Sequence, residues 1–139
     1  MKTEEYLKLY ANELINASKI TDAEFERKRD LLDLIFLSLL KIFKEEEMRL
    51  NVLGIENVIV LEDEKTITYV IALRRPGLLI GIHGETIDSV IKETREIMLW
   101  TNNIKQKEIK IDLVETSSRW SAVKRMGEIV DFYCNFFLE

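Results

Sequence analysis

Apolar residues recur along this chain with two periods, one typical of helices and one typical of strands. A loose helical period predicts a first helix over residues 3–18. The run Thr21-Asp22-Ala23-Glu24 is a capping box, which predicts that a second helix begins there and continues to about Leu50. Residues 57–61 and 66–73 are rich in β-branched and apolar residues and are predicted as two strands.

The second half of the chain predicts further helices and one more strand. The charged residues 62–65 are expected to form the turn between the first two strands. Apolar residues at helical spacing over 87–98 predict an amphipathic helix, and strict alternation over 108–114 predicts a third strand. Ser118 is expected to cap a last helix. Helices and strands of this kind in this order predict an α+β fold.

A glycine-rich run, 74–84, lies between the second predicted strand and the amphipathic helix. Gly81 and Gly84 stand three residues apart, directly before that helix. Glycine can adopt a positive φ and lets another backbone approach closely. The first amides of a helix have no intrahelical partner and carry partial positive charge, so this loop is suited to hold a phosphate group.

The sequence Ile80-Gly81-Ile82-His83-Gly84-Glu85-Thr86-Ile87 resembles the signature of KH domains. The lead-in Arg75-Pro76-Gly77 is similar to that of the type II (prokaryotic) KH domain of the small ribosomal subunit. The resemblance covers residues 23–114. It implies the order α-β-β-α-α-β, with a three-stranded sheet and helices on one face. We therefore expect a helical extension over 1–19, a type II KH domain over 20–115 and a C-terminal helix over 116–139.

The resemblance implies a protein that clamps single-stranded RNA, or alternatively single-stranded DNA, through its Gly-x-x-Gly loop. The residues expected to bind nucleic acid surround that loop or belong to the segment that joins the amphipathic helix to the last strand. They are Arg74, Arg75, Gly77, Ile80, Gly81, Ile82, His83, Gly84, Lys105, Lys107 and Lys110.

Several residues depart from the family pattern and predict weak binding. Ile82 and His83 stand where nucleic-acid-binding KH loops usually carry a basic or small polar residue. Glu85 and Asp88 follow in the first helical turn and would repel a phosphate. The net charge of −5 also argues against a strong nucleic-acid binder. The alternative is a KH-fold protein–protein interaction module without strong nucleic-acid binding, which the aromatic run 132–137 favours.

Composition limits the kind of protein that this chain can be. A chain of 139 residues is long enough for one domain with its own core. With one histidine and one cysteine, Cys134, it offers no disulfide framework, catalytic constellation or metal-ligand spacing, so we expect no enzyme and no cofactor. The densest apolar run, 31–43, is too short to span a membrane, and residues 1–5 do not resemble a secretory signal. We expect a cytoplasmic protein.

The apolar surface also predicts assembly. The run 31–43 is apolar on nearly every face, so that helix must be covered on more than one side. The last strand has one polar face, so the outer face of the sheet is expected to be solvated and the extra helices to stack on the helical side. Trp120, Val123 and Val130 would pack against the long helix. Phe132 and Phe136 would project elsewhere and support a homodimer.

Overall fold

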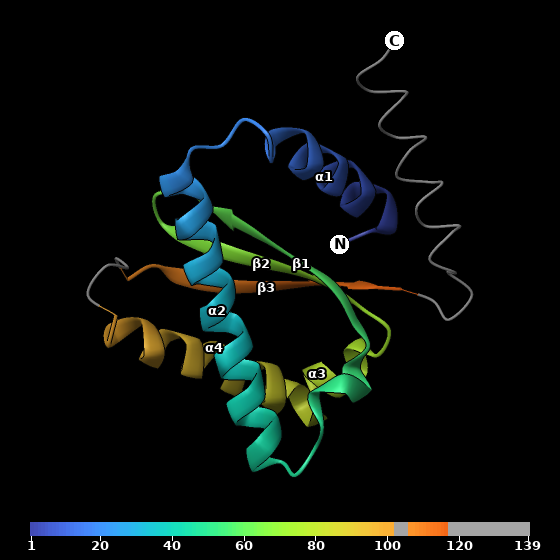
Figure 1. Cartoon of the computed structure of the whole chain (residues 1–139). Helices are drawn as coiled ribbons and strands as arrows, with labels where there is room; N and C mark the ends of the chain where they lie inside the picture. The colour runs from blue at the N-terminus through green and yellow to red at the C-terminus, as the bar shows by residue number, and fades with distance from the viewer. Residues whose placement is uncertain (102–105, 117–139) are drawn as a thin grey trace.

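The computed structural model describes residues 1–101 and 106–116, which form an α+β fold (Figure 1). The elements are α1 (Thr3–Asn16), α2 (Asp22–Glu45), the 3₁₀ turn η1 (Leu50–Leu53), β1 (Ile55–Glu62), β2 (Thr66–Leu73), α3 (Pro76–Ile80), the 3₁₀ turn η2 (Ile82–Gly84), α4 (Glu85–Leu99) and β3 (Glu108–Glu115). The predicted order from the second helix to the last strand is confirmed. The predicted C-terminal helix, the dimer contacts at Phe132 and Phe136, and Lys105 lie outside the described residues.

The three strands form one mixed sheet in the order β1-β2-β3. β1 and β2 pair antiparallel as a hairpin, and β2 and β3 pair in parallel. The hairpin turn is held by the Asp63 carboxylate, which accepts hydrogen bonds from the N–H of Lys65 at 2.8 Å and of Thr66 at 2.7 Å. Parallel strands need a crossover connection, and α3, η2 and α4 supply it. The Gly81–Gly84 loop therefore lies in the crossover, between α3 and α4.

The main core lies between the sheet and the layer of α2, α3 and α4. On β2, the side chains Ile67, Tyr69, Ile71 and Leu73 are fully buried in it, because alternate residues of a strand share one face. The Tyr69 hydroxyl donates a hydrogen bond to the carbonyl of Leu31 at 2.7 Å, which joins β2 to α2.

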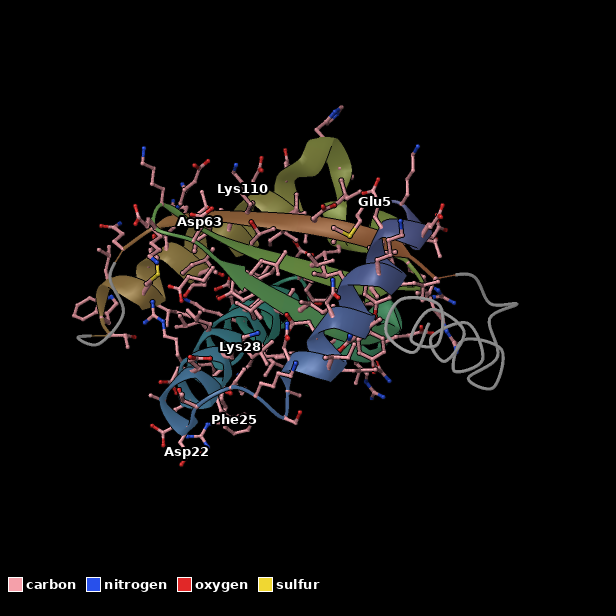
Figure 2. All side chains as sticks on the ribbon, turned by 90° about the horizontal axis from the view of Figure 1, so that it is seen from above. Glu5, Asp22, Phe25, Lys28, Asp63 and Lys110 are labelled. Carbon is pink, nitrogen blue, oxygen red and sulfur yellow. The ribbon has the colours of Figure 1, made fainter. Side chains whose placement is uncertain are left out.

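The other face of the sheet is covered by α1, so the prediction of a solvated outer face is wrong. Tyr6 and Leu7 of α1 pack with Val70 and Ala72 of β2 in a second core, on the opposite side of the sheet from α4 (Figure 1). The second half of β2 is therefore buried on both faces, because its even-numbered positions there, Val70 and Ala72, are apolar too. α1 crosses the sheet towards one end and leaves Lys110 and Asp63 at the other (Figure 2).

The predicted start of α2 is confirmed, but its predicted end is wrong. The Thr21 hydroxyl accepts a hydrogen bond from the Glu24 N–H at 3.2 Å, as a helix cap does. The helix ends at Glu45 because the chain turns there: the N–H of Glu47 bonds to Lys44 and that of Met48 to Phe43. This is a Schellman motif, and Glu47 holds the left-handed position with φ of 57°.

α2 buries one broad side against the sheet and α4. Thr94 of α4 donates a hydrogen bond to the Ser38 hydroxyl of α2 at 2.8 Å, between two fully buried side chains. On the opposite side of α2, Leu37 and Leu40 are 54% and 53% exposed. The expectation that this helix is covered on more than one side is therefore not met by the described residues.

Candidate nucleic-acid interface

Gly81 occupies a backbone conformation that only glycine adopts without strain. Its φ is 76° and its ψ is −179°. A Cβ atom at this position would lie 2.2 Å from Oγ1 and 2.7 Å from Cβ of Thr86. The Gly81 N–H bonds to the carbonyl of Gly77 at 3.0 Å and closes α3. The predicted sharp turn before the amphipathic helix is thus present, and its tightness comes from contact with the first turn of α4.

The chain enters α4 through two left-handed residues, His83 with φ of 55° and Gly84 with φ of 74°. Gly84 is the N-cap of α4 and has no side chain to bond the first helical amides. Ile82, at the tip of the loop, is 77% exposed. The Glu85 N–H already bonds to the carbonyl of Ile82, whereas the next amides of α4, with their partial positive charge, have no side-chain cap.

The side of the loop that faces α2 is acidic. The Thr86 hydroxyl donates a hydrogen bond to the Glu46 carboxylate at 3.1 Å, which ties the loop to the end of α2. Glu46 and Glu85 line a hollow of about 660 Å³ there, together with Met48, Gly77, Leu78, Gly81, Ile82, Thr86 and Ser89. Two carboxylates disfavour a phosphate, so an anionic strand would approach the loop from the side of β3.

The lead-in to the loop carries the two predicted arginines. Arg74 lies across Gly54, where a Cβ atom would come within 3.0 Å of the arginine side chain. Its Nε is 3.6 Å from Oε1 of Glu56, and its side chain is 58% exposed. Arg75 is exposed at the start of α3. Gly77 has no atom within 4 Å of where its Cβ would be, so it leaves open surface beside the loop.

Two predicted lysines lie apart from the loop. Lys107 donates hydrogen bonds to the Glu62 carboxylate at 2.9 Å and to the carbonyl of Asp63 at 2.6 Å. The parallel register places the start of β3 beside Thr66, seven residues from Leu73, which is about 23 Å along the strand. Lys110 pairs with Thr68 and, by alternation along β3, shares the sheet face that α1 covers. The structure therefore does not bring either lysine together with the loop.

A strip of partly exposed apolar side chains runs along α4 and the edge of β3 that no described strand pairs with. β3 is an edge strand that contacts both α3 and α4. Ile91 of α4 and Ile111 and Leu113 of β3 are partly buried, so part of each apolar side chain remains accessible. Ile80, at the loop end, is 41% exposed. These side chains form an apolar surface on which bases can pack.

The far end of this strip carries basic residues that the sequence reasoning missed. Arg95 and Lys65 line a hollow of about 600 Å³ with Glu64, Gln106, Lys107 and Glu108. Arg95 lies about 16 Å along the axis of α4 from Gly84, at 1.5 Å per residue. It follows Ile87 and Ile91 at four-residue intervals. That helical spacing was the available signal that Arg95 shares their face.

Within residues 1–101 and 106–116, no cluster of three or more His, Cys, Asp or Glu side chains is arranged to hold a metal ion. No helix in the same part of the chain has the length and apolar character needed to cross a membrane.

Comparison with known proteins gives one finding. The sequence model of the KH domain family matches residues 39–121, from the middle of α2 to just beyond β3. This is more than half of the chain and includes the loop, α4 and β3. A comparison with curated proteins finds no match.

Proposed function

Because this chain belongs to the KH domain family, whose members in general bind nucleic acid, we propose that it binds single-stranded RNA weakly along the 81–84 loop, α4 and β3. The observation that carries the proposal is the loop itself. Gly81 and Gly84 both have positive φ, and α4 begins directly after them with no side-chain cap on its first turn, beside the apolar strip of α4 and β3.

The RNA backbone would be held at two points. At one end, N–H groups of the loop and of the first turn of α4 donate hydrogen bonds to a phosphate. At the other end, Arg95 and Lys65 neutralise a second one. Between them, the bases pack on Ile91 and Ile111. Backbone contacts of this kind give affinity but little sequence preference.

The charges around the loop support weak rather than tight binding. Glu85 and Asp88 lie in the first turn of α4, beside the amides that would receive the phosphate. Neither residue between the two glycines is a lysine or arginine. With two to four phosphates neutralised, the logarithm of the affinity should fall with the logarithm of salt concentration with a slope of about −1.5 to −3.

The test is fluorescence anisotropy with a labelled single-stranded RNA about twice as long as the four-nucleotide stretch that a KH loop clamps. Ile82→Asp with His83→Asp should abolish binding and leave the circular dichroism spectrum unchanged, because both residues are exposed. Leu37→Asp with Leu40→Asp adds the same charge on the outer side of α2 and is the matched control. Equal losses in the two double variants, or full binding by the loop variant, would contradict the proposed site.

The far end of the strip is tested in the same titration. Arg95→Gln and Lys65→Gln should each make the salt slope shallower by about one phosphate, or roughly 0.7. Lys110→Gln removes the same charge on the face that α1 shares and should leave the slope unchanged. Single-stranded DNA of the same sequence serves as a second ligand, because only RNA offers a 2′-hydroxyl.

A second candidate function is a protein-binding module, favoured by the exposed apolar tip of the loop. Ile82 is 77% exposed next to the acidic hollow of Glu46 and Glu85. No RNA binding by the unchanged protein at low salt would favour this function. In both cases we infer a binding module in the cytoplasm rather than an enzyme, since KH domains are generally non-catalytic.

A further inference from the structure

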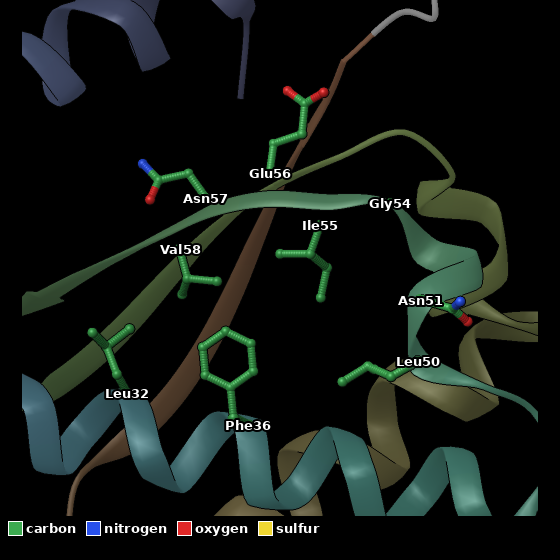
Figure 3. A pocket seen from close by; sticks show the side chains of 9 residues that line it. All are labelled: Leu32, Phe36, Leu50, Asn51, Gly54, Ile55, Glu56, Asn57 and Val58. Atoms are coloured by element: carbon green, nitrogen blue, oxygen red, sulfur yellow. The ribbon is translucent and has the colours of Figure 1, made fainter. Parts of the chain in front are cut away.

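A groove lies far from the loop, between α2 and the outer edge of β1 (Figure 3). Its volume is about 580 Å³. Ile55 and Val58 point from β1 toward α2, and Leu32 and Phe36 point back toward β1 (Figure 3). Leu50 closes one end. All five side chains are apolar and partly buried, so the groove has an apolar interior that is incompletely covered.

The outer edge of β1 is suited to pair with other chains unless something covers it. Among residues 1–101 and 106–116, β1 has a strand partner on one side only. Its middle, residues 58–60, is Val-Ile-Val, which combines high β-propensity with no charge. An open edge of this kind is a template for pairing with other chains, and proteins commonly cover it. The register irregularity between Ile55 and Asn57 disturbs only one end of the strand.

The chain leaves the described structure close to this groove. The N–H of Thr116 donates a hydrogen bond to the carbonyl of Leu73 at 2.8 Å, and Leu73 pairs with Ile55 in the neighbouring strand. Two strand spacings, about 10 Å, therefore separate the end of β3 from the end of the groove. The 23 residues from 117 to 139 would reach more than about 30 Å even at the rise of a helix.

The composition of that segment matches an apolar groove. It carries Trp120, Val123, Met126, Ile129, Val130, Phe132, Tyr133, Phe136 and Phe137. We propose that the segment 117–139 docks in the groove between α2 and β1 of the same molecule and covers the outer edge of β1. This surface is separate from the proposed nucleic-acid surface, which lies at the opposite edge of the sheet, so the inference stands independently of the proposed function.

Pairing with β1 of a second copy is a poorer fit. Antiparallel pairing of two β1 strands centred on Ile59 would place Glu56 of one copy opposite Glu62 of the other, at both ends of the pair. Like charges directly opposite one another destabilise a sheet. An anionic strand is equally unsuited, because the groove interior is formed by apolar side chains.

The experiment attaches a spin label to the full chain and measures by NMR how much it weakens the amide signals of nearby residues. Cys134 is the single cysteine, so one spin label can be attached there without other changes. A second sample carries the label at Ser121→Cys in a Cys134→Ser background, so that either half of the segment can report. We expect loss of amide signal intensity for residues 55–58 and Leu50, with intensities retained at the 81–84 loop. Intact groove signals with both labels would overturn the proposal.

Two further measurements separate the alternatives. A mixture of isotope-labelled protein without spin label and spin-labelled protein without isotope should show no loss. A loss in this mixture would assign the groove to a second copy and overturn docking within one molecule. Phe36→Asp should restore the groove signals, whereas Leu40→Asp, on the outer side of the same helix, should not. If Phe36→Asp perturbs the fold, Val58→Thr is the milder variant and should restore them in part.

Discussion

Replacing Gly81 by alanine should be the most damaging single-methyl change in the loop. The added Cβ would lie 2.2 Å from Thr86 Oγ1, 2.7 Å from Thr86 Cβ and 3.0 Å from the Thr86 backbone nitrogen. Side chains in this backbone region cost about 1–3 kcal/mol, and overpacking costs about 1–3 kcal/mol more. We expect Gly81→Ala to lower the free energy of unfolding by about 3–4 kcal/mol.

The other two glycines of the motif provide matched comparisons. Gly84 has φ of 74° but no atom within 4 Å of its missing Cβ, so Gly84→Ala should cost about 1 kcal/mol, the strain of the left-handed region alone. Gly77 has equally open surroundings and no positive φ, and it lies within α3. Gly77→Ala should therefore be neutral or stabilise by up to about 1 kcal/mol.

Urea unfolding followed by circular dichroism measures all three variants. A double variant tests the cause: adding Thr86→Gly to Gly81→Ala removes the two nearest atoms and should recover part of the loss, measured as a coupling energy against Thr86→Gly alone. Equal unfolding midpoints for Gly81→Ala and Gly77→Ala would refute the reasoning, and so would the absence of coupling between positions 81 and 86.

Two other expectations concern charge and helix termination. The hydrogen bond from Arg27, with a further contribution from Lys107 and against partial burial, holds the pKa of Glu62 at about 2 instead of the ordinary 4.5. A lowered carboxylate pKa stabilises the folded state at pH values above the ordinary pKa. About 1 kcal/mol of the free energy of unfolding, after solvent screening, should therefore be lost as pH falls from 4.5 towards 2. Acid titrations of unfolding should show this loss in the unchanged protein and not in Glu62→Gln. Glu47→Gly should raise the free energy of unfolding by about 0.5–1 kcal/mol by relieving the left-handed position, whereas Glu26→Gly, at an exposed position inside α2, should lower it by a similar amount in the same urea assay.

The elements of the fold were largely predictable, and their packing was less so. Periodicity located both strands of the hairpin, α4 and β3, because each buries a regular set of positions. The end of α2 was missed because its Schellman motif uses Glu47 where glycine is the usual signal. The place of α1 was missed because a helical pattern shows which face is apolar but not what that face covers. Val70 and Ala72 were the available hint that β2 is covered on both sides.

The loop was predictable from its two glycines, but the charges around it were not. Lys107 follows the family pattern in sequence, yet its ammonium group binds Glu62, which lies 45 residues away along the chain. Pairs of that separation depend on the assembled sheet. For Arg95 the reverse holds. It matches no family motif, and it becomes a candidate for phosphate binding only because the fold brings it to the hollow that Lys65 also lines.

The parallel pairing of β2 with β3 has a consequence for how the chain folds. β1 and β2 are joined by a short turn and can pair as soon as both exist, whereas the 34 residues from 74 to 107 separate Leu73 from Glu108. Such distant pairing forms slowly, because a long loop must close first. At a synthesis rate of roughly 5–20 residues per second, the second edge of β2 stays open for about 2–7 seconds before β3 has been made. During that interval β2 has apolar side chains on both faces and one open edge. Exposed surface of this kind promotes aggregation, and we expect chaperones to bind the unfinished chain at this stage.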